Sequence, residues 1–359
     1  MRIGIMGLAQ SGKKTLYRLL TGVEKLPPTR GDGRGEFPFG IGSVPDERVD
    51  RLSAMYEPNK TKYAEIEWAL LPALPSESKA RDHWLEQARQ LDGLCYVVRQ
   101  FGDEGVYHED GSVDPARDIG KLDLELTIAD LAIVETRLDR LSKENAKKTA
   151  AEREKQVEVL DKLKVELEAG RSLRGLELSK SEEDRLSGLK FLSRKDCLLV
   201  VNVDEAIAGE PDELAKTAAG VPADGREIVC LSAKIEVELA EIEDPGERAE
   251  FLESLGLAES GATRMAHAAL RVLGLICFMT VGPDEVRAWI VREGATAPEA
   301  AGQVHSDLER GFIRAEHMLI EELLAAGSEA KLKEQGKLAL RGKEYVVQDG
   351  DILHILANV

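Results

Sequence analysis

A short glycine-bearing segment near the N-terminus constrains the fold of this chain more than any other feature. Residues 2–6 form an apolar run that predicts a short buried strand, and residues 13–20 predict a helix. Between them, Gly7, Gly12 and Lys13 match the spacing GxxxxGK. A strand, a glycine turn and a helix in this order predict a loop whose backbone N–H groups surround phosphate oxygens at a positively polarised helix end. The alternative is a chance match to a tight strand–helix turn.

One position of this loop departs from the pattern. Lys14 stands where the pattern has a hydroxyl that ligates Mg²⁺, and an ammonium has three donors and no acceptor. Thr15 comes one residue too late and points elsewhere on the helix. The segment therefore predicts phosphate binding beside an impaired metal position. The residues expected around the phosphates are Gly7, Gln10, Ser11, Gly12, Lys13, Lys14 and Thr15.

Further apolar runs extend this start into a sheet. Each run is the length of one buried strand, and helical segments separate the runs, which predicts a parallel α/β sheet. The runs cover residues 64–71, 94–98, 197–201 and 227–231.

Two regions break this alternation of strands and helices. Between residues 122 and 167, leucines and valines recur at spacings of three and four on either side of a charged stretch at 142–156, which predicts an antiparallel helical hairpin. After about residue 275 the chain becomes strand-rich again and predicts a separate small α+β unit. Its expected strands are 277–281, 289–291, 346–347 and 352–356, with a turn at 348–351.

Composition limits the classes of function. A formal charge of −18 repels phosphate backbones over much of the surface, so we expect no DNA partner and no broad nucleic-acid footprint, although a local patch stays open. No signal peptide or membrane-length apolar segment is visible, so we expect a cytoplasmic protein with no membrane partner. The cysteines are too far apart for a metal or redox motif and are expected to be buried and reduced. They are Cys95, Cys197, Cys230 and Cys277.

An ordered series of motifs in the C-terminal third carries a resemblance to a known family. The series comprises residues 285–289 (EVRAW), 294–298 (GATAP), 305–307 (HSD), 311–316 (GFIRAE) and 345–351 (YVVQDGD), and residues 231–236 (LSAKIE) add to it. With the glycine loop, these motifs make the chain resemble the YchF group of Obg-like ATPases. The resemblance implies a P-loop, G-domain-like parallel sheet over residues 1–115 and 191–274. It further implies an inserted helical hairpin (coiled coil) over 116–190 and a TGS-like β-grasp domain over 275–359.

The resemblance also implies a purine nucleotide as ligand. In this family an Asn-x-x-Glu motif replaces the guanine-reading motif of GTPases, and Asn202 and Glu205 match it directly after a buried strand run. We therefore expect ATP or ADP, with ATP preferred over GTP. The expected base-binding residues are Asn202, Val203, Glu205, Ser232 and Ala233.

The family's histidine, a candidate for positioning the attacking water, corresponds to His108. A histidine in that loop could act as an acid or base near neutral pH, so His108 is the candidate catalytic residue. The alternative interpretation is an exposed loop histidine without a catalytic role.

The chain departs from the family where Mg²⁺ is normally supported. Leu70 and Ala73 stand where the family has the Asp and Gly of Asp-x-Ala-Gly, and residues 31–42 lack the expected switch Thr. Together with Lys14, these changes leave Mg²⁺ binding in doubt, and we expect no metal ligand. Losing the metal would cost several kcal/mol of transition-state stabilisation, roughly thousands-fold in rate.

Three functions are compatible with this sequence. The first is a slow ATPase or GTPase, and the second is a nucleotide-binding protein with weak or no hydrolysis, which the departures favour. The third is a nucleotide-independent interaction protein that uses the hairpin and the TGS-like domain. The family resemblance makes the ribosome, or ribosomal RNA contacted through local patches, the first macromolecular partner to test.

Overall fold

The computed structural model describes residues 1–26, 35–75, 77–143, 150–208, 220 and 226–358. The chain forms two compact units, which are described separately. The first unit comprises Met1–Gly40 with Trp68–Ala262, and the second comprises Ile41–Glu67 with Thr263–Val359. The helical hairpin belongs to the first unit, and a segment from the N-terminal part of the chain joins the second. The three-domain boundaries expected from the sequence stay a prediction.

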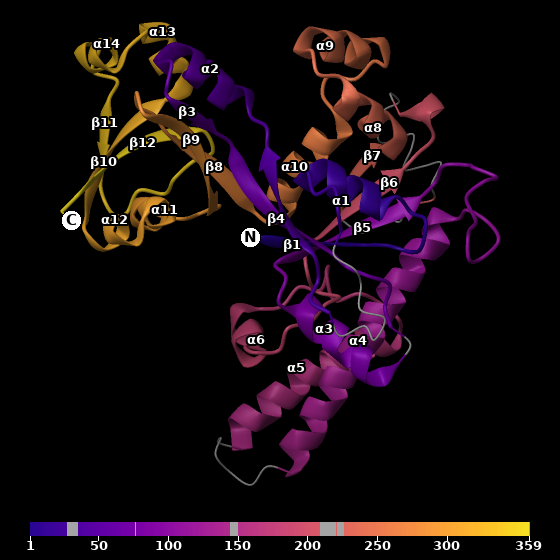
Figure 1. The fold of residues 1–359 in the computed structure, drawn as a ribbon. Helices are drawn as coiled ribbons and strands as arrows, with labels where there is room; N and C mark the ends of the chain where they lie inside the picture. Colours follow the sequence, from indigo (N-terminus) through magenta and orange to yellow (C-terminus); the bar gives the residue numbers. More distant parts are fainter. Residues whose placement is uncertain (27–34, 76, 144–149, 209–219, 221–225, 359) are drawn as a thin grey trace. The chain divides into compact units, whose positions relative to one another are not determined.

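The first sheet is built on the parallel strands that the apolar runs predicted (Figure 1). Its order is β2-β4-β1-β5-β6-β7, and β1, β5, β6 and β7 pair in parallel, which confirms the predicted α/β class. The strands are β1 (Arg2–Met6), β2 (Phe39–Val44), β4 (Ala64–Leu70), β5 (Gly93–Arg99), β6 (Cys197–Asn202) and β7 (Glu227–Leu231).

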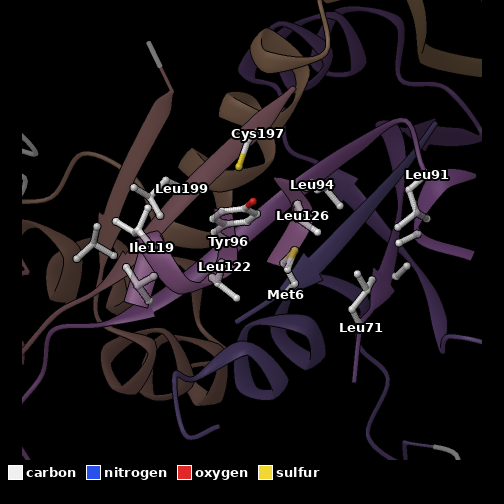
Figure 2. Packing of buried hydrophobic residues seen from close by; sticks show 14 of the residues in the cluster. Met6, Leu71, Leu91, Leu94, Tyr96, Ile119, Leu122, Leu126, Cys197 and Leu199 are labelled. Atoms are coloured by element: carbon white, nitrogen blue, oxygen red, sulfur yellow. The ribbon is translucent and has the colours of Figure 1, made fainter. Parts of the chain in front are cut away.

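Helices cover this sheet and close its core. They are α1 (Lys13–Thr21), α3 (Ser78–Arg89), α8 (Ala233–Glu241) and α9 (Pro245–Ser254), whereas all but the first two residues of α10 (Gly261–Val272) belong to the second unit. β5 and β6 are buried along their whole length, because helices lie over both faces of a parallel sheet. Figure 2 shows Met6, Leu71 and Tyr96 in one apolar cluster with side chains of α4. The four cysteines are free and buried, as predicted.

The predicted hairpin is formed by α4 (Pro115–Lys143) and α5 (Ala150–Glu168), followed by the short α6 (Lys180–Arg185). Val134, Leu141 and Leu160 are among the buried side chains between its helices. α4 ends and α5 begins within the charged stretch 142–156, and residues 144–149 lie outside the described part. The carboxylate of Asp130 on α4 accepts the N–H groups of Leu192 at 3.0 Å and Ser193 at 2.7 Å, which fixes the base of the hairpin.

The second unit contains a sheet of order β11-β10-β12-β8-β9-β3. Its elements are α2 (Glu47–Tyr56), β3 (Lys60–Lys62), β8 (Leu275–Thr280), β9 (Glu285–Arg292), α11 (Ala297–Val304), α12 (Ser306–Arg310), β10 (Phe312–Leu319), α13 (Ile320–Ala326), α14 (Glu329–Glu334), β11 (Ala339–Arg341) and β12 (Asp351–Ala357). The expected strands at 277–281, 289–291 and 352–356 and the turn at 348–351 are confirmed, with Gly350 at φ 85°. The expected strand at 346–347 is wrong, since Val346 makes a single bridge to Thr296.

Within residues 41–67, β3 completes this second sheet and α2 joins the same unit from a distant part of the sequence. β3 pairs in parallel with β9, with Thr61 opposite Val286. α2 starts at the cap Asp46, whose carboxylate accepts the N–H of Arg48 at 2.9 Å. Arg51 on α2 forms a two-pronged ion pair with Glu321 at 2.6 and 2.8 Å. This segment is therefore a structural part of the C-terminal unit. Among the described residues, no helix has the length and apolarity to cross a membrane.

Candidate functional site

The sequence-predicted site residues gather at one edge of the first sheet. The loops that follow β1, β5, β6 and β7 leave the sheet at the carboxyl ends of parallel strands, where open α/β sheets bind their ligands. The phosphate-loop residues, His108, Asn202 and Ser232 lie in or directly beside these loops. The topology thus brings together segments that are up to about 225 residues apart in the sequence.

The loop between β1 and α1 has the backbone of an anion-binding nest. Gln10 and Gly12 both adopt left-handed conformations, with φ 60° and 96°. Ser11 between them is not left-handed, so the backbone conformation alternates along the loop. Such alternation turns successive N–H groups to one side. A non-glycine residue held at positive φ, here Gln10, also marks a constrained site. Gly12 precedes α1, so the nest lies at the helix N-terminus.

The two loop glycines have no room for a side chain. A Cβ on Gly7 would overlap the carbonyl oxygen of Val97 on β5, and a Cβ on Gly12 would overlap the Nδ2 atom of Asn202. The close approach of the loop to β5 and β6 therefore requires glycine at both positions.

Asn202 ties the phosphate loop to the loop after β7. It is buried, and its Nδ2 atom donates to the carbonyl of Ser11 at 3.0 Å while its Oδ1 atom accepts the N–H of Ala233 at 2.9 Å. One side chain thereby fixes two loops that approach the site from opposite sides. Of the other expected base-binding residues, Val203 and Ser232 are buried, and Glu205 is exposed with its carboxylate bonded to the ammonium of Lys234.

Lys13 is turned inward onto its own loop. Its ammonium donates to the carbonyl oxygens of Gly7 at 2.8 Å and Leu8 at 3.0 Å. Burial, followed by the charge of the neighbouring Lys14, lowers the pKa of Lys13 to about 8, and Glu109 opposes this shift. The loop thus holds a desolvated ammonium that would gain from an anionic partner.

The remaining loop side chains differ in exposure. Ser11 is buried, and its hydroxyl has no partner among the residues that the structure describes. Lys14 is exposed on the first turn of α1, and Thr15 is half-buried one position further along. The ammonium of Lys14 is close enough to Lys13 to shift its pKa.

His108 is not an exposed loop residue, which corrects that alternative interpretation. It is buried, with its Nε2 atom 3.0 Å from Oδ2 of Asp118 and its Nδ1 atom accepting the N–H of Asp110 at 3.2 Å. Since Nδ1 accepts, we assign the ring proton to Nε2, which donates to the carboxylate. Arg117 binds the other oxygen of Asp118 at 2.8 Å. Both ring nitrogens are therefore engaged, one by the loop between β5 and α4 and the other by the first turn of α4.

Arg99 is a site-forming residue that sequence reasoning missed. It is buried at the end of β5, and its guanidinium donates to the carbonyls of Phe101, Asp103 and Val106 at 3.1, 3.1 and 2.9 Å. These bonds shape the loop that carries His108. Arg99, His108 and Asp118 line a small hollow together with Leu8 and Ser11 of the phosphate loop. The sequence feature that could have revealed Arg99 is its position as an arginine at the end of an apolar run.

The end of β4 offers no ligand for a metal. β4 lies next to β1, and the N–H of Leu71 donates to the carbonyl of Ile5 at 2.9 Å, so the two strands end side by side. Leu70 and Leu71 are buried, and residues 68–75 contain no carboxylate. In the described part of the chain, no group of three or more His, Cys, Asp and Glu side chains could hold a metal ion. Part of the switch stretch 31–42, namely 31–34, lies outside the described residues. At the two positions described here, the end of β4 and Lys14, the chain therefore supplies neither the carboxylate nor the hydroxyl that commonly ligates Mg²⁺.

A parallel sheet whose first strand runs through a glycine-dependent nest into a helix defines the P-loop class of α/β proteins. Within this class, the chain belongs to the YchF family of Obg-like ATPases. It is 39% identical over 370 residues to Ribosome-binding ATPase YchF of Bacillus subtilis (strain 168), covering 99% of each chain. It is 33% identical over 373 residues to Obg-like ATPase 1 of Oryza sativa subsp. japonica, covering 100% of this chain and 92% of that protein.

A solved structure and a family profile agree with this assignment. The structure of the Schizosaccharomyces pombe YchF GTPase is similar to this chain with a TM-score of 0.84 and 28% sequence identity, covering 99% of this chain and 97% of that one. Residues 275–358 match the family YchF-GTPase_C, described as a protein of unknown function (DUF933).

Proposed function

We propose that this chain binds a purine nucleoside di- or triphosphate at residues 7–15 and turns it over slowly or not at all. The nest that Asn202 ties to the loop after β7 carries the proposal, because it joins a phosphate cradle to a candidate base-binding loop. The names of relatives, which include ATPases and a GTPase, support a nucleotide as ligand.

ATP is the proposed preference over GTP. Guanine presents paired N–H donors that need a carboxylate acceptor at the base-binding loop. The Glu205 carboxylate is already bonded to the ammonium of Lys234, which makes it a poorer acceptor for those donors. Adenine does not require this acceptor, so the ion pair disfavours guanine more than adenine.

Slow turnover follows from two features of the site. The end of β4 and Lys14 supply no metal ligands, and phosphoryl transfer depends on a metal ion to neutralise developing charge. In addition, His108 has both ring nitrogens engaged, so it cannot order an attacking water in this conformation. We propose that any residual hydrolysis requires His108 to leave Asp118.

The ribosome is the proposed macromolecular partner, since relatives at 39% and 35% identity are named ribosome-binding ATPases. Co-sedimentation with ribosomes, with and without ATP, tests this proposal. Ribosome binding that changes with nucleotide and is lost in Lys13→Ala would indicate that it depends on nucleotide binding. Binding unchanged by Lys13→Ala would favour the nucleotide-independent interaction protein instead.

Isothermal titration calorimetry with ATP, ADP and GTP tests nucleotide binding itself, in parallel with single-turnover hydrolysis of radiolabelled ATP. We expect saturable binding of ATP and ADP, weaker binding of GTP, and hydrolysis far slower than binding. Failure of every nucleotide to bind a folded protein would overturn the proposal.

A further inference from the structure

We infer that the site takes its nucleotide without a divalent cation, because the ammonium of Lys14 supplies the charge that Mg²⁺ supplies in other P-loop proteins, and that Mg²⁺ weakens binding. The inference rests on the proposed nucleotide binding and adds the ionic form of the ligand. The ligand is the metal-free polyphosphate, ADP or ATP, with its full negative charge.

The position of Lys14 is the first step. Walker loops end in a hydroxyl residue directly after the lysine, and that hydroxyl ligates Mg²⁺ bound to the terminal phosphates. Lys14 occupies this place on the first turn of α1, and its side chain is exposed. An ammonium cannot ligate a metal, but it can donate three hydrogen bonds to phosphate oxygens.

The neighbouring strand end is the second step. Mg²⁺ demands near-octahedral oxygen ligation, usually with one or two carboxylates. At the end of β4, Leu70 and Leu71 are packed in the apolar core, and the next residue is Pro72. At these two positions a metal ion brought by a nucleotide would therefore meet an ammonium and aliphatic carbons in place of the hydroxyl and carboxylate oxygens that commonly ligate it.

The surroundings of Lys13 are the third step. Its ammonium and that of Lys14 are near enough to repel one another, and carbonyl oxygens of the loop hold the first in place. The hydroxyl of Ser11 in the same loop is buried without a partner among the described residues. A bare polyphosphate would relieve the repulsion and give this hydroxyl an acceptor. A bound Mg²⁺ would cancel part of the phosphate charge and add a further cation beside two others.

Calorimetric titration of the full chain with ADP, in EDTA and in excess MgCl₂, tests the inference. We expect saturable binding in EDTA and an affinity lower by roughly tenfold or more in MgCl₂, the scale of one charge-assisted contact. In Lys14→Ser, which restores the hydroxyl, we expect weaker binding in EDTA and no loss of affinity on adding Mg²⁺. Since Lys14 is exposed, this substitution should not unfold the protein.

Arg18→Gln provides the matched control. Arg18 is an exposed cation one turn further along α1, so its loss changes the net charge equally without touching the position after Lys13. The Mg²⁺ response of Arg18→Gln should equal that of the unaltered chain. An affinity that rises with Mg²⁺, or does not respond to it, would refute the inference while leaving nucleotide binding intact. Absence of binding in both conditions would refute the proposed function itself.

Discussion

The strands β1 and β4 end side by side in the first unit, yet the two ends have opposite chemistry. After β1, a strained backbone turns N–H groups inward, and glycines at positions 7 and 12 allow the loop to approach β5 and β6. After β4, buried leucines lead into Pro72, and residues 68–75 contain no carboxylate. Phosphate recognition depends mainly on backbone geometry, whereas metal binding depends on a few side chains. The two capacities of a P-loop site can therefore be separated by changing side chains alone.

The largest expected effect comes from placing a carboxylate at the end of β4. Leu70 is 5% exposed, so Leu70→Asp buries a charge without a partner and should cost about 3–5 kcal/mol of folding free energy. Chemical denaturation measures this loss. Leu124→Asp on α4, where the side chain is 50% exposed, is the control and should cost less than about 1 kcal/mol. A stable Leu70→Asp variant that binds Mg²⁺ would mean that a single substitution can rebuild the metal site.

The next effect concerns the loop after β1. Gly12→Ala places a methyl group against the Asn202 amide at φ 96°, which should break the tie to Ser11 and weaken ADP binding by about a hundredfold or more. Gly170→Ala is the control, because Gly170 has φ 70° but nothing within 4 Å of the added carbon. Equal effects of the two substitutions on ADP affinity would mean that a general loss of stability, and not the contact with Asn202, is responsible.

A smaller effect is expected from removing the loop ammonium. Lys13→Met keeps much of the aliphatic volume and should weaken ADP binding by roughly 10- to 100-fold, the range for charge-assisted hydrogen bonds. It should leave folding intact or slightly stabilise the protein, because the lost ammonium is desolvated. Titration calorimetry measures the ADP affinity, and thermal unfolding of the same samples measures the stability. Undiminished ADP affinity in this variant would argue against phosphate contact by Lys13.

The smallest effect is a pH dependence. The free chain holds the pKa of Lys13 at about 8, and a phosphate partner would raise it, so binding above pH 8 must take up a proton. As far as Lys13 is concerned, affinity for ADP should be nearly full at about pH 7 and fall by roughly tenfold between pH 7 and 9. Calorimetry in buffers of different ionisation enthalpy measures the proton uptake directly. Lys13→Met should lack this uptake, and its persistence there would assign the titration to another group.

Much of the first sheet could be predicted from sequence because its strands are continuous apolar runs. β10 was missed because Arg314, Glu316 and His317 interrupt its apolar pattern. His317 is nevertheless buried, since Asp351 lies 2.8 Å from its Nε2 atom, and that partner is distant in sequence. β3 was missed for a different reason, because all its side chains are exposed and its backbone pairing with β9 holds it.

The part of the site that follows a local sequence pattern could be predicted. The glycine loop was found from its spacing between a strand and a helix, and Asn202 from the family resemblance together with its position after a strand. The pairing of His108 with Asp118 and the bonds that Arg99 makes depend on how the loop after β5 folds back on itself, which no local pattern encodes. The alternative interpretation of His108 as an exposed loop residue was wrong, because this folding of the loop buries the side chain.

The segment 41–67 has a consequence for how this protein can be divided. A gene fragment starting at residue 275 would carry every residue matched by the YchF-GTPase_C family, yet it would lack β3 and α2. The outer edge of β9 and the side chain of Glu321 would lose the partners that this segment supplies. Part of the C-terminal unit, namely α2 and β3, is encoded between the phosphate loop and β4. Recombination that exchanges only the residues from 275 onward would therefore not transfer the complete unit. The phosphate loop and the complete C-terminal unit are therefore encoded in one interleaved stretch of sequence.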